Sequence, residues 1–252
     1  MNFSILIPTR TRIPLLANLL SSIFQTTKEQ SLVEVLIVYD LDDIGTINVI
    51  QQFEEQYKYI HVKFYGKERS IAINKDYYNW LALNHAKGDY VLAVNDDCLF
   101  LKSGWDVLGV AKLKEYLQDK PDGVVYGLTE DNEYEPTRAK TQFFSCFPLV
   151  SLKAVQVLGG IFDDEFHRDG ADWAIFPVYF HFQRVIDLRD CIVIQHISVR
   201  SKRRQWDALD DYSLKLSKVL KYPGTQDFVQ RNINKLKPYI DSFKPPEEPK
   251  QT

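Results

Sequence analysis

Charged and polar side chains follow three short apolar runs of this 252-residue chain, and their types suit a phosphate ester and a metal ion. The turn PTRTR at 8–12 follows the first run, Asp40 follows the second, and the triplet NDD at 95–97 follows the fourth. Carboxylate oxygens are the ligands that Mg²⁺ and Mn²⁺ prefer, and arginine pairs with phosphate oxygens. A diphosphate leaving group needs such a cation to absorb its developing charge. Asn and Asp are also common in plain turns, so the residue types alone leave both interpretations open.

Two further residues could do chemistry. Asp172 follows Gly170 at the expected start of a helix, where it could be a helix cap or a general base for a hydroxyl proton. His196 ends the apolar run CIVIQ, where a neutral imidazole could bind Mn²⁺ or could serve only as a hydrogen-bonded residue of the fold. The segment VRSKRRQW at 199–206 includes Arg200 and Arg204, which could close over a diphosphate or form a solvated surface.

The elements that must position these residues follow from the hydrophobic pattern. Apolar runs at 3–8, 33–39, 59–65 and 89–95 alternate with helical patterns at 15–24, 47–57 and 72–86. Strands without inward and outward alternation are typical of a parallel sheet that helices cover on both faces. In such a sheet ligands bind beyond the carboxyl ends of the strands, so the polar turns are expected to meet at one rim.

The fold class predicted is therefore α/β, with a Rossmann-like, mostly parallel central sheet flanked by helices and a C-terminal helical extension. The second half predicts helices near 104–118, 151–159 and 171–182, and strands at 123–128, 185–188 and 191–197 that continue the same sheet. No linker rich in Pro, Gly or Ser interrupts residues 1–204, which are expected to form one domain with halves at 1–100 and 101–204. Helices are predicted over 205–243 and a disordered tail over 244–252.

Composition excludes several classes of protein. A net charge of −3, from 31 basic and 34 acidic residues, argues against bulk capture of nucleic acid, and 45% apolar residues exclude wholesale disorder. The cysteines Cys98, Cys146 and Cys191 lack disulfide or zinc spacing and fit a reducing compartment. No run approaches the roughly 18–20 apolar residues of a membrane span, so a cytoplasmic location with at most peripheral membrane contact is expected.

The motifs together resemble the GT-A-fold glycosyltransferases of the large inverting family 2. The resemblance rests on FSILIPTRTR, VLIVYD, GDYVLAVNDDC, GGIFDDEF with GADW, and QHISV, and it covers about residues 2–200. It implies transfer of a sugar from a nucleotide diphosphate to a glycan or another hydroxyl acceptor, with Mn²⁺ or Mg²⁺ as cofactor. UDP is the expected nucleotide, with dTDP and GDP as alternatives. The expected biological context is the synthesis of a glycan such as a polysaccharide.

The resemblance also implies roles for individual residues. Asp97 would hold the metal with His196 as a further ligand, and Asp172 would be the general base. The half at 1–100 would bind the nucleotide and the half at 101–204 the acceptor. The residues expected to contact the donor are Pro8, Thr9, Arg12, Asp40, Asn95, Asp96, Arg200 and Arg204.

The chain departs from the family pattern at two positions. Asn95 stands where the first acid of the metal motif is usual and brings no charge to a cation, and Ala171 stands where a Glu is usual before the Asp. A degenerate protein that binds a nucleotide sugar without turnover therefore stays open. A sugar-phosphate nucleotidyltransferase is a weaker alternative, because the first turn lacks the glycines that cradle a triphosphate. The absence of GxGxxG at the same place argues against NAD chemistry.

Overall fold

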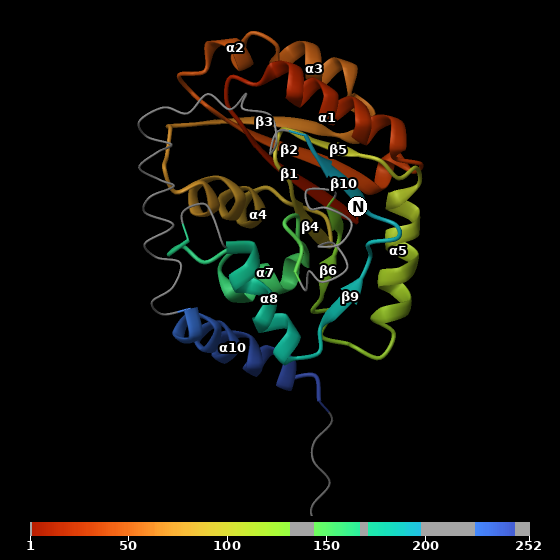
Figure 1. The fold of residues 1–252 in the computed structure, drawn as a ribbon, viewed down its shortest axis with the longest axis vertical. Coiled ribbons are helices and arrows are strands. Elements are labelled where there is room, and N and C mark those ends of the chain that lie inside the picture. The colour runs from red at the N-terminus through yellow and green to blue at the C-terminus, as the bar shows by residue number, and fades with distance from the viewer. Residues whose placement is uncertain (1, 132–143, 167–170, 198–224, 245–252) are drawn as a thin grey trace, which may run out of the picture.

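The computed structural model describes residues 2–131, 144–166, 171–197 and 225–244 (Figure 1). Its centre is a seven-stranded sheet with the order β3-β2-β1-β4-β8-β6-β9. The strands are β1 (Phe3–Thr9), β2 (Val33–Asp40), β3 (Val62–Lys67), β4 (Tyr90–Ala93), β6 (Tyr126–Leu128), β8 (Leu149–Ser151) and β9 (Val185–Asp187). Neighbouring strands are parallel except at β8, which runs antiparallel to both β4 and β6. The mostly parallel central sheet predicted from the sequence is confirmed.

Helices cover both faces of this sheet. They are α1 (Ile13–Thr26), α2 (Ile44–Ile47), α3 (Ile50–Gln56), a π-helix (Asn74–Asn79) that continues into α4 (Trp80–Asn84), α5 (Trp105–Tyr116), α7 (Leu152–Leu158), α8 (Ala171–His181) and α10 (Thr225–Asp241). Alternate residues of β1 face opposite ways: Ile5 and Ile7 pack in the core under α1, whereas Leu6 packs with the core under α4, α7 and α8. Burial on both faces explains why β1 reads as a continuous apolar run.

The prediction that the strand at 191–197 continues the central sheet is wrong. β10 (Val193–His196) lies in a separate three-stranded sheet between β5 (Cys98–Phe100) and β7 (Glu130–Asp131). A turn after β9, in which the carbonyl of Leu188 accepts from the amides of Cys191 and Ile192 at 3.0 and 2.8 Å, redirects the chain. β10 can then pair antiparallel with β5, which directly follows the NDD triplet.

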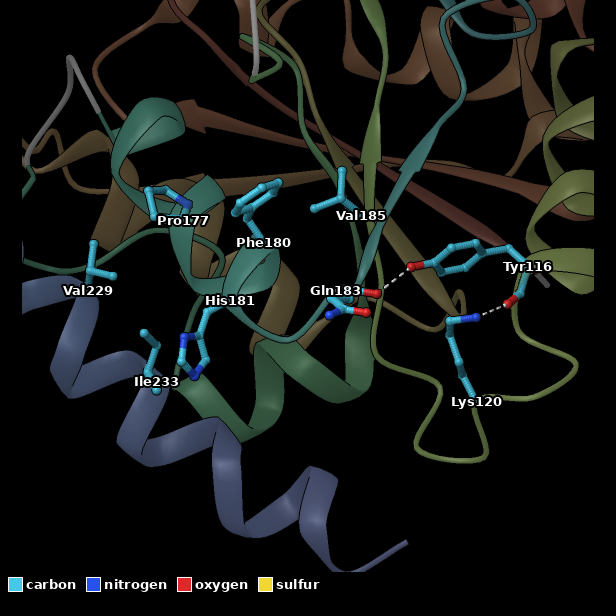
Figure 2. Close-up of a pocket in the computed structure, with 9 residues that line it drawn as sticks. All are labelled: Tyr116, Lys120, Pro177, Phe180, His181, Gln183, Val185, Val229 and Ile233. Atoms are coloured by element: carbon cyan, nitrogen blue, oxygen red, sulfur yellow. Dashed lines mark hydrogen bonds between the residues drawn. The ribbon is translucent and has the colours of Figure 1, made fainter. Parts of the chain in front are cut away.

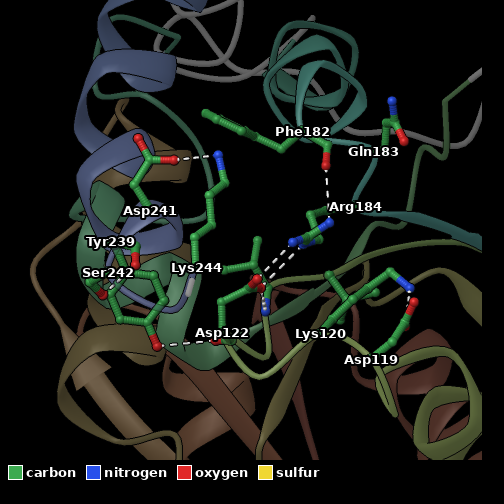
Figure 3. Close-up of polar contacts among 12 residues, drawn as sticks. Asp119, Lys120, Asp122, Phe182, Gln183, Arg184, Tyr239, Asp241, Ser242 and Lys244 are labelled. Carbon is green, nitrogen blue, oxygen red and sulfur yellow. Dashed lines mark hydrogen bonds and ion pairs between the residues drawn. The ribbon is translucent and has the colours of Figure 1, made fainter. Parts of the chain in front are cut away.

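The C-terminal helical piece is present as α10, which packs on α7 and α8. Phe228, Leu236 and Ile240 of this helix are buried in the core of that face. Figure 3 shows polar contacts that reinforce the attachment: the Tyr239 hydroxyl donates to the carbonyl oxygen of Asp122 at 3.1 Å, and Asp122 also pairs with Arg184 at 2.7 Å. The rest of the predicted extension and the predicted tail after 244 lie outside the described residues, and the domain boundaries stay predictions. No helix in the described ranges is long and apolar enough to cross a bilayer.

Candidate active site

The polar turns predicted to meet do so at the carboxyl ends of β1, β2 and β4, which are parallel neighbours. Two clusters of carboxylates form there, one around Asp40 and one around Asp96 and Asp97. The turn after β1 supplies an arginine to each. Thr9 ends β1 and is buried, whereas Pro8, opposite Val38 of β2, is only half-buried.

The backbone of the turn explains why its two arginines diverge. Thr11 has φ of 54°, a left-handed conformation that is rare for a β-branched residue. Its amide donates to Oδ2 of Asp43 at 2.7 Å, and Asp43 also caps the start of α2 by accepting from the amide of Thr46. With Thr11 held in this way, the side chain of Arg10 lies against the first carboxylate cluster and that of Arg12 against the second.

The first cluster fixes Asp40 from both sides. Nη1 of Arg10 donates to Oδ2 of Asp40 at 2.8 Å and also pairs with Asp42, while the Tyr77 hydroxyl donates to Oδ1 of Asp40. Nε of Arg69 lies 3.9 Å from Asp40. Burial raises the pKa of the Asp40 carboxyl, and the hydrogen bonds from Tyr77 and Arg10 act in the opposite direction. The sequence predicted Asp40 but missed Arg10 and Tyr77 as its partners.

The second cluster is a buried acidic pair held by one arginine. Nη1 of Arg12 lies 2.6 Å from Oδ1 of Asp96 and 3.0 Å from Oδ2 of Asp97, and the Thr9 hydroxyl donates to Asp96 at 2.9 Å. Burial raises the pKa of Asp96 to about 6, the charge of Arg12 opposes that rise, and the charge of Asp97 adds to it. Arg12 therefore supplies positive charge where two acids are removed from water.

A possible metal-binding group lies beside this pair. Ligand atoms of Asp97, Cys98 and His196 all lie within 4.8 Å of one another, and Nε2 of His196 is 2.9 Å from Oδ1 of Asp97. The register of β10 on β5 places His196 directly opposite Cys98. One carboxylate and one imidazole fit a divalent cation such as Mn²⁺, and a thiol ligand would favour softer metals. The sequence missed Cys98, and its position directly after Asp97 is the signal that could have found it.

Asn95 is held by a residue from the neighbouring helix. The Tyr78 hydroxyl lies 2.9 Å from both the carbonyl oxygen of Val94 and Oδ1 of Asn95. Because a hydroxyl has one proton, it can donate to one of these oxygens at a time. When Tyr78 donates to Oδ1, the side chain of Asn95 is held by a neutral hydrogen bond.

Asp172 lies in the first turn of α8 and is half-buried. α8 leads into β9, which runs parallel to β6. The start of α8 therefore lies toward the end of the sheet at which β1 and β4 have their carboxyl ends. Burial raises the pKa of Tyr126, and the nearby charge of Asp172 contributes to that rise. Arg200 and Arg204 lie outside the described residues.

A groove of about 900 Å³ opens near the amino end of β9, at the opposite end of the strands from the carboxylate clusters. Figure 2 shows residues that line it: Phe180 and His181 from α8, Val229 and Ile233 from α10, Val185 as the first residue of β9, and Tyr116 from α5. The carboxylate clusters lie where the parallel strands end, whereas Val185 lies where such a strand begins. The groove is therefore separate from the candidate active site.

Comparison with known proteins identifies the family of this chain and structures with a similar fold. Residues 4–156 match the family described as glycosyl transferase family 2. No curated protein matches the chain. Among solved structures, the mannosyltransferase PcManGT from Pyrobaculum calidifontis, in complex with GDP-Man and Mn²⁺, is 16% identical with a TM-score of 0.61, over 97% of this chain and 76% of that one.

Two other similar structures carry UDP or a UDP-sugar, in place of GDP-Man, in their names. TarS 1–349 of S. aureus in complex with UDP-GlcNAc is 14% identical with a TM-score of 0.61, covering 96% of this chain and 73% of that chain. GalNAc-T7 with UDP, GalNAc and Mn²⁺ is 12% identical with a TM-score of 0.64, covering 95% and 54%. At these identities the likeness shows a shared GT-A fold. Since the family match spans more than half of the residues, this chain belongs to glycosyltransferase family 2.

Proposed function

We propose that the chain transfers a sugar from a nucleotide diphosphate to a hydroxyl acceptor, with inversion at the anomeric carbon. The observation that carries the proposal is the meeting of Arg12, Asp97 and His196 beyond the ends of β1, β4 and β10 in a family 2 chain. Arginine and a carboxylate–imidazole pair are the groups that a diphosphate and its cation require.

The donor half would hold the nucleotide through the turn after β1 and through Asp40. Uracil, thymine and guanine all present ring N–H donors, and the Asp40 carboxylate, fixed by Arg10 and Tyr77, is a suitable acceptor. Thr9 and Arg12 lie close enough to the acidic pair to contact ribose or phosphate once a donor is bound. Pro8, Asn95 and Asp96 complete the proposed donor contacts. A UDP-sugar is the first choice, with dTDP- and GDP-sugars next.

Asp97 and His196 would hold Mn²⁺ or Mg²⁺, and the cation would stabilise the negative charge of the leaving diphosphate. The Arg12 guanidinium already lies against the same carboxylate, so the protein has a positive charge at this point before a metal arrives. Arg200 and Arg204 are proposed to add positive charge over the diphosphate.

Asp172 is the proposed general base. Inverting transfer needs one carboxylate to accept the acceptor's hydroxyl proton as that oxygen attacks the anomeric carbon. No partner acid is required, because the leaving group is stabilised by cations. The acceptor would be a glycan or another hydroxyl compound in polysaccharide or related synthesis, met in the cytoplasm or at a membrane surface.

The test is release of free nucleotide from a panel of UDP-, dTDP- and GDP-sugars in the presence of mixed glycan acceptors, each with Mn²⁺, with Mg²⁺ and with EDTA. We expect release from one nucleotide class, dependent on the metal, and its loss in Asp97→Asn. Asp119→Asn is the matched control, because Asp119 is exposed and its side chain pairs with the neighbouring Lys120.

A second candidate is a protein that binds a nucleotide sugar without turnover, favoured by Asn95 and Ala171. It predicts metal-dependent nucleotide binding with no release from any sugar nucleotide, also after addition of mixed glycan acceptors. Release that is lost in Asp172→Asn would eliminate this candidate.

A further inference from the structure

The π-helix Asn74–Asn79 contacts both sides of the candidate active site. Toward the donor side, the Tyr77 hydroxyl donates to the buried Asp40 carboxylate, and the next residue, Tyr78, places its hydroxyl 2.9 Å from Asn95. Two successive tyrosines thus contact two of the polar turns: Tyr77 contacts Asp40 at the end of β2, and Tyr78 contacts Asn95 after β4. Both tyrosine side chains are themselves buried.

Toward the acceptor side, the same helix grips the loop 160–166, which precedes α8. Oδ1 of Asn79 accepts from the amides of Ile161 and Phe162 at 2.8 and 3.0 Å, and its Nδ2 donates to the carbonyl of Phe162 at 2.6 Å. Asn74 donates to the carbonyl of Phe166 at 2.7 Å. Both asparagines are buried, so these hydrogen bonds replace water for the loop backbone.

The approach of the loop to Asn79 is so close that it depends on glycine. A Cβ atom at Gly160 would lie 2.4 Å from Nδ2 of Asn79. The ring of Tyr78 also meets the ring of Phe162 edge to face, with centroids 5.6 Å apart. The loop and the helix therefore pack as one unit at this point.

The π-helical geometry accounts for the pairing of the two asparagines. In an α-helix, side chains five residues apart point about 140° away from each other. In a π-helix the i→i+5 hydrogen bond brings such residues onto one face, and here the amide of Trp80 bonds to the carbonyl of Lys75. Asn74 and Asn79 can then face the same loop, while Tyr77 and Tyr78 between them face the donor turns.

We propose that the π-helix Asn74–Asn79 is the positioning element that sets the proposed acceptor loop 160–166 relative to the donor turns. Asn79 is its principal positioning residue. The proposal deepens the proposed sugar transfer and rests on it, since the consequence of the alignment is a competent approach of the acceptor.

The test compares Asn79→Asp with the control Asn84→Asp. The aspartate has the size of Asn79, but it cannot donate to Phe162, and its charge is repelled by the carbonyl oxygen of Phe162 and by Asp164, whose Oδ1 is 3.3 Å from Nδ2. We expect this repulsion to separate the loop from position 79 and to open the hydrogen bonds from the amides of Ile161 and Phe162. Asn84 is exposed on α4, and its side chain donates to the carbonyl of Trp80 in its own helix.

In Asn79→Asp we expect amide hydrogen exchange of residues 160–166 to rise at least tenfold and kcat for transfer to fall at least tenfold. The KM for the sugar nucleotide and the affinity for the nucleotide with Mn²⁺ should stay within about threefold, because Tyr77 and Tyr78 still hold the donor turns. Asn84→Asp should match the wild type in amide exchange, kcat, KM and nucleotide affinity. If Asn79→Asp does not fold, Asn74→Asp, which loses the hydrogen bond from Asn74 to the carbonyl of Phe166, should give the same pattern with smaller changes.

Unchanged exchange of residues 160–166 in Asn79→Asp would overturn the proposal. So would a parallel fall of nucleotide affinity and transfer, which would mark Asn79 as a residue of general stability. If the wild type transfers no sugar at all, the proposed function fails, whereas hydrogen exchange and nucleotide binding still decide whether the π-helix positions the loop independently of the donor turns.

Discussion

The two sides of the candidate active site are held in different ways. On the donor side, carboxylates and arginines are buried or half-buried together, as in the contact of Arg12 with Asp96 and Asp97. On the proposed acceptor side, the loop 160–166 is held by neutral amide hydrogen bonds from Asn74 and Asn79. The ion pairs of that loop, Asp164 with Lys75 at 3.5 Å and Glu165 with Arg231 at 2.8 Å, join exposed side chains.

This difference has physical consequences. Charged groups in a low-dielectric setting respond strongly to a metal, to pH and to the loss of one partner. Neutral hydrogen bonds and close packing respond instead to side-chain size and donor number. The stability and ligand affinity of the donor side should therefore change with metal concentration and pH. Those of the proposed acceptor side should not. The predictions below test that division, from the largest effect to the smallest.

The largest effect should come from Asp172→Asn. Removing the proposed base should lower kcat for transfer by about 10²- to 10⁴-fold, because the acceptor oxygen would have to attack without giving up its proton to a side chain. Nucleotide affinity with Mn²⁺ should be unchanged. Steady-state kinetics and a nucleotide titration measure the two quantities. A loss of nucleotide affinity comparable to the loss of kcat would remove the division between the two sides.

Arg12→Gln should lower the free energy of unfolding in the absence of metal, because it removes a charge from the donor side. The substitution leaves Asp96 and Asp97 buried without a full positive charge, and removing one partner of a buried ion pair costs about 3–5 kcal/mol. Partial exposure of the Arg12 side chain reduces the expected loss to about 2 kcal/mol. Urea unfolding with and without Mn²⁺ measures it. Mn²⁺ should restore part of the stability, and an equal loss in both conditions would count against a cation at this place.

Asp96→Asn should have a smaller effect that depends on pH. Because burial raises the pKa of Asp96 to about 6, above its value in the unfolded chain, the folded state binds the proton more tightly. The ionised carboxylate therefore costs stability above pH 6, and that cost disappears as the pH falls toward 4.

The neutral amide should accordingly raise the free energy of unfolding by about 1 kcal/mol at pH 8 and by much less at pH 4.5. Thermal unfolding at the two pH values measures the difference. Asp119→Asn, at an exposed site, should show no comparable change between them. A destabilisation by Asp96→Asn that is equal at both pH values would contradict the role assigned to burial.

Much of the donor side could be predicted from the sequence. β1, β2 and β4 are continuous apolar runs, and a parallel sheet brings their carboxyl ends together whatever the details of packing. That rule was enough to name Asp40 and Asp97 as residues of one rim. Their partners could not be predicted. The backbone conformation at Thr11 directs the side chains of Arg10 and Arg12 to different carboxylates, and the residue types do not reveal that conformation.

Other parts of the site were less predictable. The pattern at 72–86 predicts one continuous helix, whereas the structure divides it into the π-helix and α4, and Asn79 at their junction contacts a loop more than 80 residues away. β5 has only three residues and becomes a strand by pairing with β10. That pairing, which sets His196 opposite Cys98, is a long-range contact without a local sequence signal.

The most direct measurement is thermal unfolding of the wild type and Asp97→Asn with UDP, dTDP and GDP, each with and without Mn²⁺. A ligand at 100 times its Kd stabilises the folded state by about 2.7 kcal/mol, a rise in Tm of several degrees for a chain of this size. The account predicts a rise for one nucleotide that requires Mn²⁺ and is lost in Asp97→Asn. No rise with any nucleotide at millimolar concentration, or a rise that Asp97→Asn retains in full, would contradict a metal-assisted donor site at the ends of β1 and β4.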